Sequence, residues 1–574
     1  MPLRTLRPFL ISVSALALLA ISLVPPVSAA AGRPPTPASS PAAPPACATL
    51  AADSANGIAG NASIKSAASV IVPADGKNLA YCKVSLLYST NPNQKINIVV
   101  GLPLSTADGG SGGMQGAWNG RTEGLGGGGC TGNLNVTAAV NAGYVGSGTD
   151  LGHSGGDCTP GVNADGTYNL QFIDDFIRNG IKQQILWSKL IANAYYGMRP
   201  QFNYWNGCST GGRQGLLLAQ ELGNELDGIL ANAPAIYWTR FQTAQMWGEM
   251  VMKKVTGGPI APEKLAQAQA SAVADCDKKD GVADGLIDDP RTCHFSAKAI
   301  VCGASGAPAT NCLTEKEAEA VDLIWDGPRN EKGERIWFPL DRGTSFAGLD
   351  GPATFGLGLI QFEWNEHNLN FDWQTADYAQ VAQDGSRNIA DVTDTFGSLD
   401  EFKNNGGKLI TWVGGNDQLI FPRGVINYYR QMASRYSANG KPDFANLQNF
   451  YRLFRAPGVG HCGGGAGPAP VDAFGALVSW VEHGNAPASL LAKGGSAAPP
   501  SGRSRPLCPY PQTALYNGTG DINDAASFHC GGNLETPATV CADVLVSYKR
   551  EVQGDLDFRG TGVTKALCKR NKDS

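Results

Sequence analysis

The segment 204–214 contains the pattern Gly-x-Ser-x-Gly, with Ser209 at its centre. An aromatic run at 202–205 precedes it, and a helix-like run at 214–222 follows it. This strand–turn–helix context is typical of a nucleophile elbow, which projects a serine hydroxyl above a sheet, and Gly207 and Gly211 are expected to allow the sharp turn. The chain has 73 glycines, so this pattern could also arise by chance. The alternative is therefore an ordinary glycine-rich turn with a solvated serine. The flanking runs favour a catalytic serine.

Two later segments provide candidate partners for this serine. Residues 406–417 are expected to form a strand that ends in a loop carrying Asp417, and residues 450–457 a strand that opens into a loop carrying His461. The order Ser209, Asp417, His461 is that of α/β-hydrolases. A lone histidine is more often structural than catalytic, but this position favours His461 as the general base. The other histidines lack the strand-to-loop setting: His153, His294, His367, His483 and His529.

A glycine-dense stretch at 124–129 lies between an expected strand at 95–102 and the nucleophile. In a hydrolase of this type such a loop can bring a backbone N–H group to a developing oxyanion. The alternative is a flexible surface loop.

An acidic, glycine-punctuated loop at 276–289 suggests a metal site. Asp277, Asp280 and Asp284 recur at intervals of three and four residues, and the carbonyls of Val282 and Leu286 would complete a shell of hard oxygen ligands. Such ligands suit calcium, although the spacing is not that of an EF-hand. The alternative is a solvated acidic loop, but the repeated Asp-Gly pairs favour calcium.

The N-terminus predicts export. Two arginines, an apolar run at 9–24 and small residues at 27–31 are typical of a signal peptide covering 1–31, followed by a Pro/Ala/Ser-rich linker at 32–46. The run is too short for a membrane anchor, and no later stretch is long and apolar enough to span a bilayer. The formal charge of −5 gives no indication of a nucleic-acid partner. We therefore expect a secreted or periplasmic protein with no membrane anchor after signal cleavage.

The 14 cysteines of an exported chain point to disulfides, and the absence of Cys-x-x-Cys argues against zinc. Cys208 and Cys462 each adjoin a candidate catalytic residue, and their partners stay open at this point. Local spacing predicts six pairs: Cys47–Cys82, Cys130–Cys158, Cys276–Cys293, Cys302–Cys312, Cys508–Cys530 and Cys541–Cys568.

The remaining pattern predicts a doubly wound α/β sheet, because strand-like and helix-like runs alternate. Expected elements include strands at 95–102, 144–150 and 227–235 and a helix at 181–196. Between 237 and 395 the alternation lapses, which predicts an inserted lid. The catalytic domain would then consist of a first part at 47–236 and a second part at 396–574.

The chain resembles the tannase and feruloyl esterase family of secreted serine esterases, which includes mono(2-hydroxyethyl) terephthalate hydrolases. The resemblance covers nearly the whole mature chain, and its matching segments are 207–215, 227–229, 233–235, 414–417, 460–462, the loop 276–293 and the run 505–530. It implies an α/β-hydrolase fold with a large lid, a structural calcium ion at the acidic loop, and a Cys208–Cys462 bridge. The Cys130–Cys158 and Cys541–Cys568 pairs go beyond the usual family set. Terephthalate-ester hydrolases often have an acidic residue where this chain has Thr210.

These observations predict a secreted serine esterase that hydrolyses small aromatic esters of the feruloyl or galloyl type through an acyl-enzyme. Asp417 would fix the histidine tautomer, and the N–H of Thr210 with that of Gly127 or Gly128 would form the oxyanion hole. One alternative is a mono(2-hydroxyethyl) terephthalate hydrolase. An alternative of another class is a calcium-stabilised extracellular binding protein with an inactive hydrolase fold.

Overall fold

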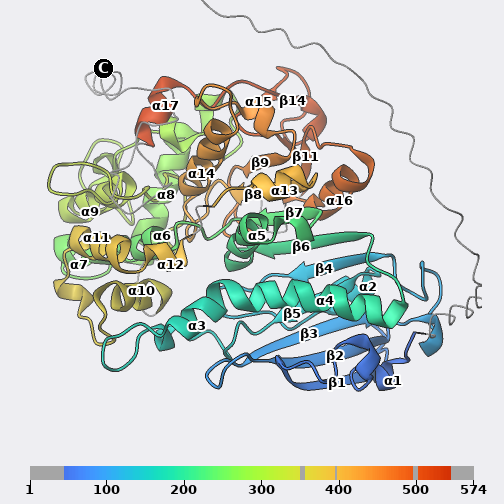
Figure 1. Ribbon diagram of the computed structural model, residues 1–574. Coiled ribbons are helices and arrows are strands. Elements are labelled where there is room, and N and C mark those ends of the chain that lie inside the picture. Colours follow the sequence, from blue (N-terminus) through green and yellow to red (C-terminus); the bar gives the residue numbers. More distant parts are fainter. Residues whose placement is uncertain (1–43, 349–355, 395–396, 495–501, 544–574) are drawn as a thin grey trace, which may run out of the picture. The chain divides into compact units, whose positions relative to one another are not determined.

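A nine-stranded sheet organises the chain in the computed structural model, which describes residues 44–348, 356–394, 397–494 and 502–543 (Figure 1). The predicted signal peptide and most of the predicted linker lie outside these residues. The strand order is β1-β2-β3-β5-β4-β6-β7-β8-β9. The strands are β1 (Ile64–Val72), β2 (Tyr81–Tyr88), β3 (Ile96–Pro103), β4 (Arg121–Leu125), β5 (Val145–Thr149), β6 (Phe202–Cys208), β7 (Gly228–Asn232), β8 (Lys408–Gly414) and β9 (Tyr451–Ala456).

The pairing directions give the sheet its class. Strands β5, β4, β6, β7, β8 and β9 pair in parallel, whereas β1, β2, β3 and β5 pair antiparallel. The parallel strands are buried along most of their length because helices cover both of their faces. The predicted α/β class is confirmed, as are the expected strands around 95–102, 144–150, 227–235, 406–417 and 450–457.

Strand β6 shows how the two faces are filled. Tyr204 and Trp205 are adjacent and both fully buried, and they point to opposite sides of the sheet. Trp205 belongs to the core beneath helices α4 and α5, and Tyr204 belongs to the core beneath α16. The strand before the nucleophile is therefore fixed from both sides. In Figure 1, α4 crosses in front of β3, β4 and β5, with which it is in contact.

Strand β4 was missed by the sequence analysis, which assigned Gly124 and Leu125 to a loop. Its short sequence is polar, yet it pairs with both β5 and β6 in the middle of the sheet. The polar side chains are satisfied within the fold, because Glu123 accepts a hydrogen bond from Asn206 and Arg121 forms an ion pair with Glu482. Desolvation raises the pKa of Glu123.

The segment between β7 and β8 carries the insertion predicted as a lid. Its described residues contain helices α6 to α12 and no strand of the nine-stranded sheet. After β9, two small sheets follow: β10 (Ala469–Pro470), β11 (Leu490–Lys493) and β12 (Ser504–Leu507), and then β13 (Thr513–Tyr516) and β14 (Phe528–Gly531). The chain from Pro44 onward clusters as one compact unit, so the insertion does not separate from the sheet.

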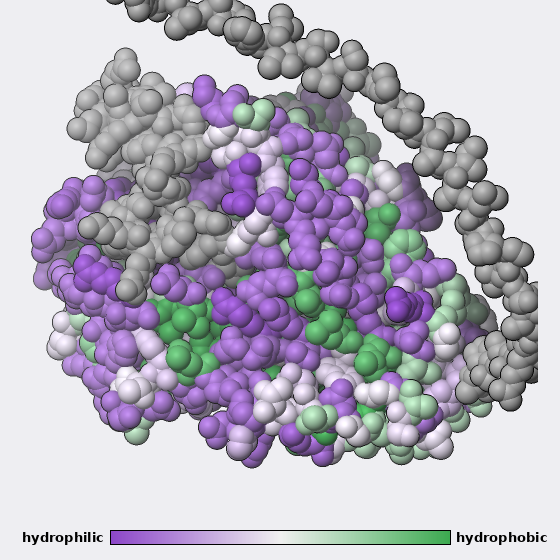
Figure 2. Space-filling model, in the orientation of Figure 1, coloured by the Kyte–Doolittle hydropathy of each residue, from purple (hydrophilic) through white to green (hydrophobic). Residues whose placement is uncertain are grey.

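The helices complete the fold, and the expected helix at 181–196 is confirmed as α4. They are α1 (Cys47–Leu50), α2 (Thr137–Asn141), α3 (Leu170–Asp174), α4 (Gly180–Tyr196), α5 (Thr210–Glu221), α6 (Trp238–Gln245), α7 (Trp247–Thr256), α8 (Pro262–Cys276), α9 (Glu315–Asp326), α10 (Gly356–Glu366), α11 (Tyr378–Asn388), α12 (Ala390–Thr393), α13 (Asp400–Asn404), α14 (Pro422–Arg435), α15 (Phe444–Leu447), α16 (Ala473–His483) and α17 (Pro537–Ala542). In the described ranges, none is long and apolar enough to cross a membrane. The face in Figure 2 is largely hydrophilic, with apolar side chains in small separate patches.

Candidate active site

Ser209 lies between β6 and α5, on the sharp turn that the sequence predicts. Its φ of 62° and ψ of −122° are strained for a residue with a side chain. Three backbone hydrogen bonds hold this conformation: the Ser209 N–H donates to Asn232 O, and the Ser209 carbonyl accepts from Arg213 and Ala235. In the described part of the chain the Ser209 hydroxyl has no hydrogen-bond partner.

The two motif glycines are needed because the backbone passes close to their Cα atoms. Neither Gly207 nor Gly211 has a positive φ; the unusual backbone conformation falls on Ser209 itself. A Cβ added to Gly207 would instead lie 2.5 Å from the Gly211 backbone, and one added to Gly211 would lie 3.0 Å from Gly126 and Gly127. Gly207 therefore allows the tight turn of the elbow, as predicted, and Gly211 allows the glycine loop to approach the elbow closely.

Asp417 and His461 meet at the carboxyl ends of β8 and β9. Asp417 is almost fully buried, and its Oδ1 accepts the N–H groups of Leu419 and Ile420 at 2.9 and 2.8 Å. Its Oδ2 lies 2.9 Å from His461 Nδ1. When Nδ1 donates to this carboxylate, His461 Nε2 carries the free lone pair that a general base needs.

A disulfide joins the serine and histidine loops. Cys208 and Cys462 are bonded, with their Cα atoms 6.0 Å apart and 254 residues between them in sequence. His461 Nε2 lies 3.6 Å from Cys462 Sγ, so the imidazole is next to the bridge. The bridge implied by the family resemblance is therefore confirmed, and it links the residues directly beside Ser209 and His461.

The local disulfide predictions agree with the structure wherever both cysteines are described. The five local bridges are Cys47–Cys82, Cys130–Cys158, Cys276–Cys293, Cys302–Cys312 and Cys508–Cys530. The predicted Cys541–Cys568 pair cannot be followed in the same way, because Cys568 lies outside the described residues.

Some backbone N–H groups of the glycine loop already donate to an acceptor within the protein, and others do not. Gly127 donates its N–H to Gln214 Oε1 at 3.0 Å, and Gly128 donates its N–H to Thr131 O at 3.0 Å. Both amides predicted as the second oxyanion donor are thus already engaged. Within the described ranges, the Gly129 and Thr210 N–H groups have no acceptor.

The loop is also in contact with the lid. A Cβ on Gly129 would lie 3.6 Å from Leu357, which belongs to the first turn of lid helix α10.

The amide of Cys130, like that of Gly129, lacks an acceptor among the described residues. The Gly129 carbonyl of the same peptide is turned toward Thr210, so the Cys130 N–H points the opposite way. Among the described residues, Gly129 is therefore the glycine of this Gly127–Gly129 run whose amide is left without an acceptor.

His153 is a residue near the site that the sequence analysis set aside. Its Nε2 lies 2.5 Å from Cys130 O and its Nδ1 lies 3.4 Å from Leu151 O, so it holds the loop directly after Gly129. Phe172 packs against the ring at a centroid distance of 4.8 Å. A glycine loop that ends in a cysteine gives no sequence signal for such a contact, because it depends on how β5 ends beside the loop.

The acidic loop has the donor types that a hard cation requires, but its carboxylates are partly engaged. Asp277 Oδ1 accepts the N–H groups of Asp284, Gly285 and Leu286, and Asp284 pairs with Arg505. Among the described residues, no three His, Cys, Asp or Glu side chains form a group that could hold a metal ion. The remaining negative charge is still poorly balanced.

Burial is the main cause of raised pKa values at two carboxyl groups of this loop. Partial desolvation and then the Asp288 carboxylate raise the pKa of Asp280 to about 7. Desolvation, with the nearby Asp284 carboxylate, raises the pKa of Asp288 to about 6 against the opposing effect of Arg455.

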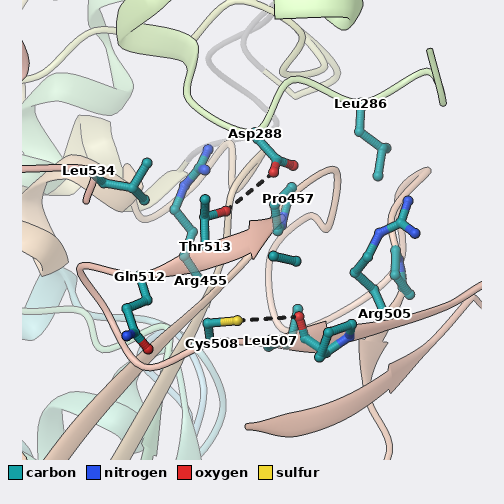
Figure 3. A pocket seen from close by; sticks show the side chains of 13 residues that line it. Leu286, Asp288, Arg455, Pro457, Arg505, Leu507, Cys508, Gln512, Thr513 and Leu534 are labelled. Atoms are coloured by element: carbon teal, nitrogen blue, oxygen red, sulfur yellow. Dashed lines mark hydrogen bonds between the residues drawn. The ribbon is translucent and has the colours of Figure 1, made fainter. Parts of the chain in front are cut away.

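A small cavity with a mixed polar and apolar lining lies between this loop and the C-terminal strands (Figure 3). Asp288 accepts a hydrogen bond from Thr513 at 3.3 Å, and Arg455 and Arg505 point into the same space. Its volume of about 20 Å³ is enough for a water molecule and far too small for an ester substrate. The cavity is therefore distinct from the site at Ser209.

The sheet order and the positions of these residues define an α/β-hydrolase fold, with Ser209 after β6, Asp417 after β8 and His461 after β9. The solved structure of tannin acyl hydrolase from Aspergillus niger shares this fold, with a TM-score of 0.69 at 22% identity over 89% of this chain and 96% of that one.

Comparison with sequence relatives shows to which family of α/β-hydrolase-fold proteins the chain belongs. The family model for tannase and feruloyl esterase matches residues 114–356 and 354–531. A probable feruloyl esterase of Arthroderma benhamiae is 34% identical over 483 residues, covering 78% of this chain and 85% of that protein. A mono(2-hydroxyethyl) terephthalate hydrolase of Piscinibacter sakaiensis is 27% identical over 502 residues, covering 73% of this chain and 80% of that protein. The chain therefore belongs to the tannase and feruloyl esterase family and is a carboxylic ester hydrolase.

Proposed function

We propose that this chain is an exported serine esterase that hydrolyses aromatic carboxylic esters of the feruloyl or galloyl type through an acyl-enzyme. The observation that carries the proposal is the 2.9 Å contact between His461 and Asp417, on a loop that Cys462 ties to Cys208 beside Ser209. Disulfides persist in oxidising compartments, so the six bridges support export.

The chemistry follows from the roles of the three side chains. His461 Nε2 takes the proton from Ser209 Oγ as the oxygen attacks the ester carbon. The resulting imidazolium is stabilised by Asp417, and it then protonates the leaving alcohol. Water, activated by the same nitrogen, releases the aromatic acid from Ser209 and restores the enzyme.

The oxyanion of each tetrahedral intermediate needs two donors next to Ser209. We assign these to the N–H groups of Thr210 and Gly129. Thr210 begins helix α5, whose N-terminal dipole also favours negative charge. The assignment moves the second donor from the predicted Gly127 or Gly128, whose amides have acceptors in the protein, to the next glycine.

A substrate panel tests the ester class. The protein would be assayed against methyl ferulate, a gallate ester and mono(2-hydroxyethyl) terephthalate, and kcat/KM would be compared. The Arthroderma relative is named a feruloyl esterase, and Thr210 replaces the acidic residue common in terephthalate-ester hydrolases, so we expect the phenolic esters to be preferred. The Piscinibacter relative supports the second candidate, the terephthalate monoester, and a preference for that substrate would replace the first.

We also propose that the loop 276–289 binds a structural calcium ion. Asp277, Asp280 and Asp284 with the carbonyls of Val282 and Leu286 supply oxygen ligands of the type calcium prefers. The raised pKa values of Asp280 and Asp288 support the proposal, because they come first from burial and then from neighbouring carboxylates, and a bound cation would stabilise these charges. Such an ion would stabilise the loop and take no part in the ester chemistry.

A further inference from the structure

We propose that the Thr210 side chain is a positioning group that fixes the oxyanion hole, an inference that rests on the proposed function. Thr210 Oγ1 donates a hydrogen bond to Gly129 O at 2.7 Å, and the Thr210 residue is only 1% exposed. Thr210 and Gly129 are also the two residues whose N–H groups are assigned to the oxyanion. One side-chain hydrogen bond therefore joins the two donor residues directly.

The conformation of the glycine loop makes this bond important. Gly128 and Thr131 exchange two backbone hydrogen bonds, so residues 128–131 form a two-residue hairpin turn. Gly129 has a φ of 58°, and Cys130 is not in the left-handed region. A positive φ at the first central residue alone is typical of a type II′ turn, whereas type I′ has a positive φ at both. The two types differ by a flip of the central peptide, which joins Gly129 to Cys130.

Every other peptide from Gly126 to Thr131 is held by the backbone or by a different side chain. Gln214 Oε1 accepts from Gly127 N–H, Gly211 donates to Gly127 O, and His153 binds Cys130 O. Among the described residues, the central peptide of the turn has a single hydrogen-bond partner, the Thr210 hydroxyl. Loss of this hydroxyl would remove the one hydrogen bond made to that peptide within the described residues, and with it the direct link between Gly129 and Thr210.

The expected consequence is on kcat. An oxyanion donor is most effective when it is already aimed at the charge that develops in the transition state. A misplaced donor weakens transition-state binding, while contacts to the unreacted ester are largely unchanged, so KM changes little. Loss of a complete donor reduces kcat by roughly 10²–10³, so misplacement of one should cost about tenfold or somewhat more.

The test compares Thr210→Val with Thr210→Ser on a chromogenic aromatic ester, with wild type and Ser209→Ala measured in parallel. Valine keeps the branched shape and the Thr210 backbone N–H but removes the hydroxyl, whereas serine keeps the hydroxyl. We expect T210V to lower kcat about tenfold or more with KM within about twofold, and T210S to recover most of that loss. Affinity for an arylboronic acid, which forms a tetrahedral adduct at the serine, should fall in T210V in parallel with kcat.

The outcomes separate the two proposals. If S209A retains turnover, the proposed function fails. If wild type is active and S209A is not, but T210V keeps wild-type kcat and boronate affinity, only the positioning role is overturned. An equal loss in T210V and T210S would also overturn it, since the hydroxyl would then not be the group that matters. If T210V does not fold, Thr210→Ala removes the same hydroxyl, and an unchanged kcat in that variant overturns the positioning role.

Discussion

At the scale of single residues, the site depends on conformations that the surrounding chain imposes. Ser209 adopts a backbone conformation that costs on the order of 1–3 kcal/mol for a non-glycine residue. Asn232, Arg213 and Ala235 stabilise it through backbone hydrogen bonds. Asp417 is fixed in the same way, because one carboxylate oxygen accepts two loop amides and only the other faces His461.

This division of the Asp417 carboxylate predicts the effect of Asp417→Asn. The asparagine oxygen can still accept the Leu419 and Ile420 amides, so the fold should survive. Its NH₂ group would face His461 Nδ1 and favour the tautomer whose Nε2 carries the proton. We expect kcat to fall by about 10³-fold or more, measured on an aromatic ester, with the melting temperature nearly unchanged.

The matched control is Asp472→Asn, because asparagine also serves well as the cap of α16. It should leave both kcat and melting temperature close to wild type. An Asp417→Asn enzyme with more than a tenth of wild-type kcat would contradict the role given to this carboxylate.

At the scale of elements, two loops from distant parts of the sequence are held together beside the end of the sheet. The Cys208–Cys462 bridge closes 254 residues, and the inserted lid lies within that span. In the chain-entropy model such a bridge stabilises the fold by about 5 kcal/mol, and it also holds together the two residues that adjoin Ser209 and His461.

Replacement of both cysteines, Cys208→Ser with Cys462→Ser, should therefore lower both stability and kcat. The comparison is Cys302→Ser with Cys312→Ser, which removes a bridge closing only 10 residues in the lid segment. That double replacement should lower the free energy of unfolding by about 3 kcal/mol or less and leave kcat near wild type. Thermal unfolding and ester hydrolysis measure both effects. Equal kcat losses in the two double variants would show that the bridge does not position the catalytic groups.

At the scale of the whole molecule, the acidic loop connects the inserted segment to the C-terminal strands. Asp284 forms an ion pair with Arg505 of β12, and Asp288 accepts a hydrogen bond from Thr513 of β13. A cation bound to this loop would strengthen that connection without touching Ser209. At a free concentration about 100 times its Kd, it would add about 3 kcal/mol to the free energy of unfolding.

Chelation should accordingly lower the melting temperature without immediately abolishing the reactivity of Ser209. Calorimetry with and without chelator, followed by calcium or magnesium addition, measures the effect and its selectivity. Metal analysis of protein prepared without chelators should find calcium. Its absence, together with an unchanged melting temperature, would contradict the calcium proposal.

The sequence predicted the site residues that directly follow an expected strand. Ser209, Asp417 and His461 each follow an apolar strand, and parallel strands bring their carboxyl ends to one edge of the sheet. Strand β4 was not predictable in this way, because its polar residues are buried by partners far away in sequence, such as Glu482. The free amide of Gly129 was missed for a similar reason: Gln214 and Thr131 engage its neighbours only after the loop packs on α5.

The central claim is that Ser209 is an activated nucleophile, and covalent labelling tests it most directly. Wild-type protein would be treated with a fluorophosphonate and with an aromatic ester, and intact-mass and peptide analysis would locate any adduct. We predict a single adduct on the peptide containing Ser209 and turnover of the ester, both lost in Ser209→Ala. Turnover by Ser209→Ala would contradict the account, and wild-type protein that is neither labelled nor active would indicate a binding protein with an inactive hydrolase fold.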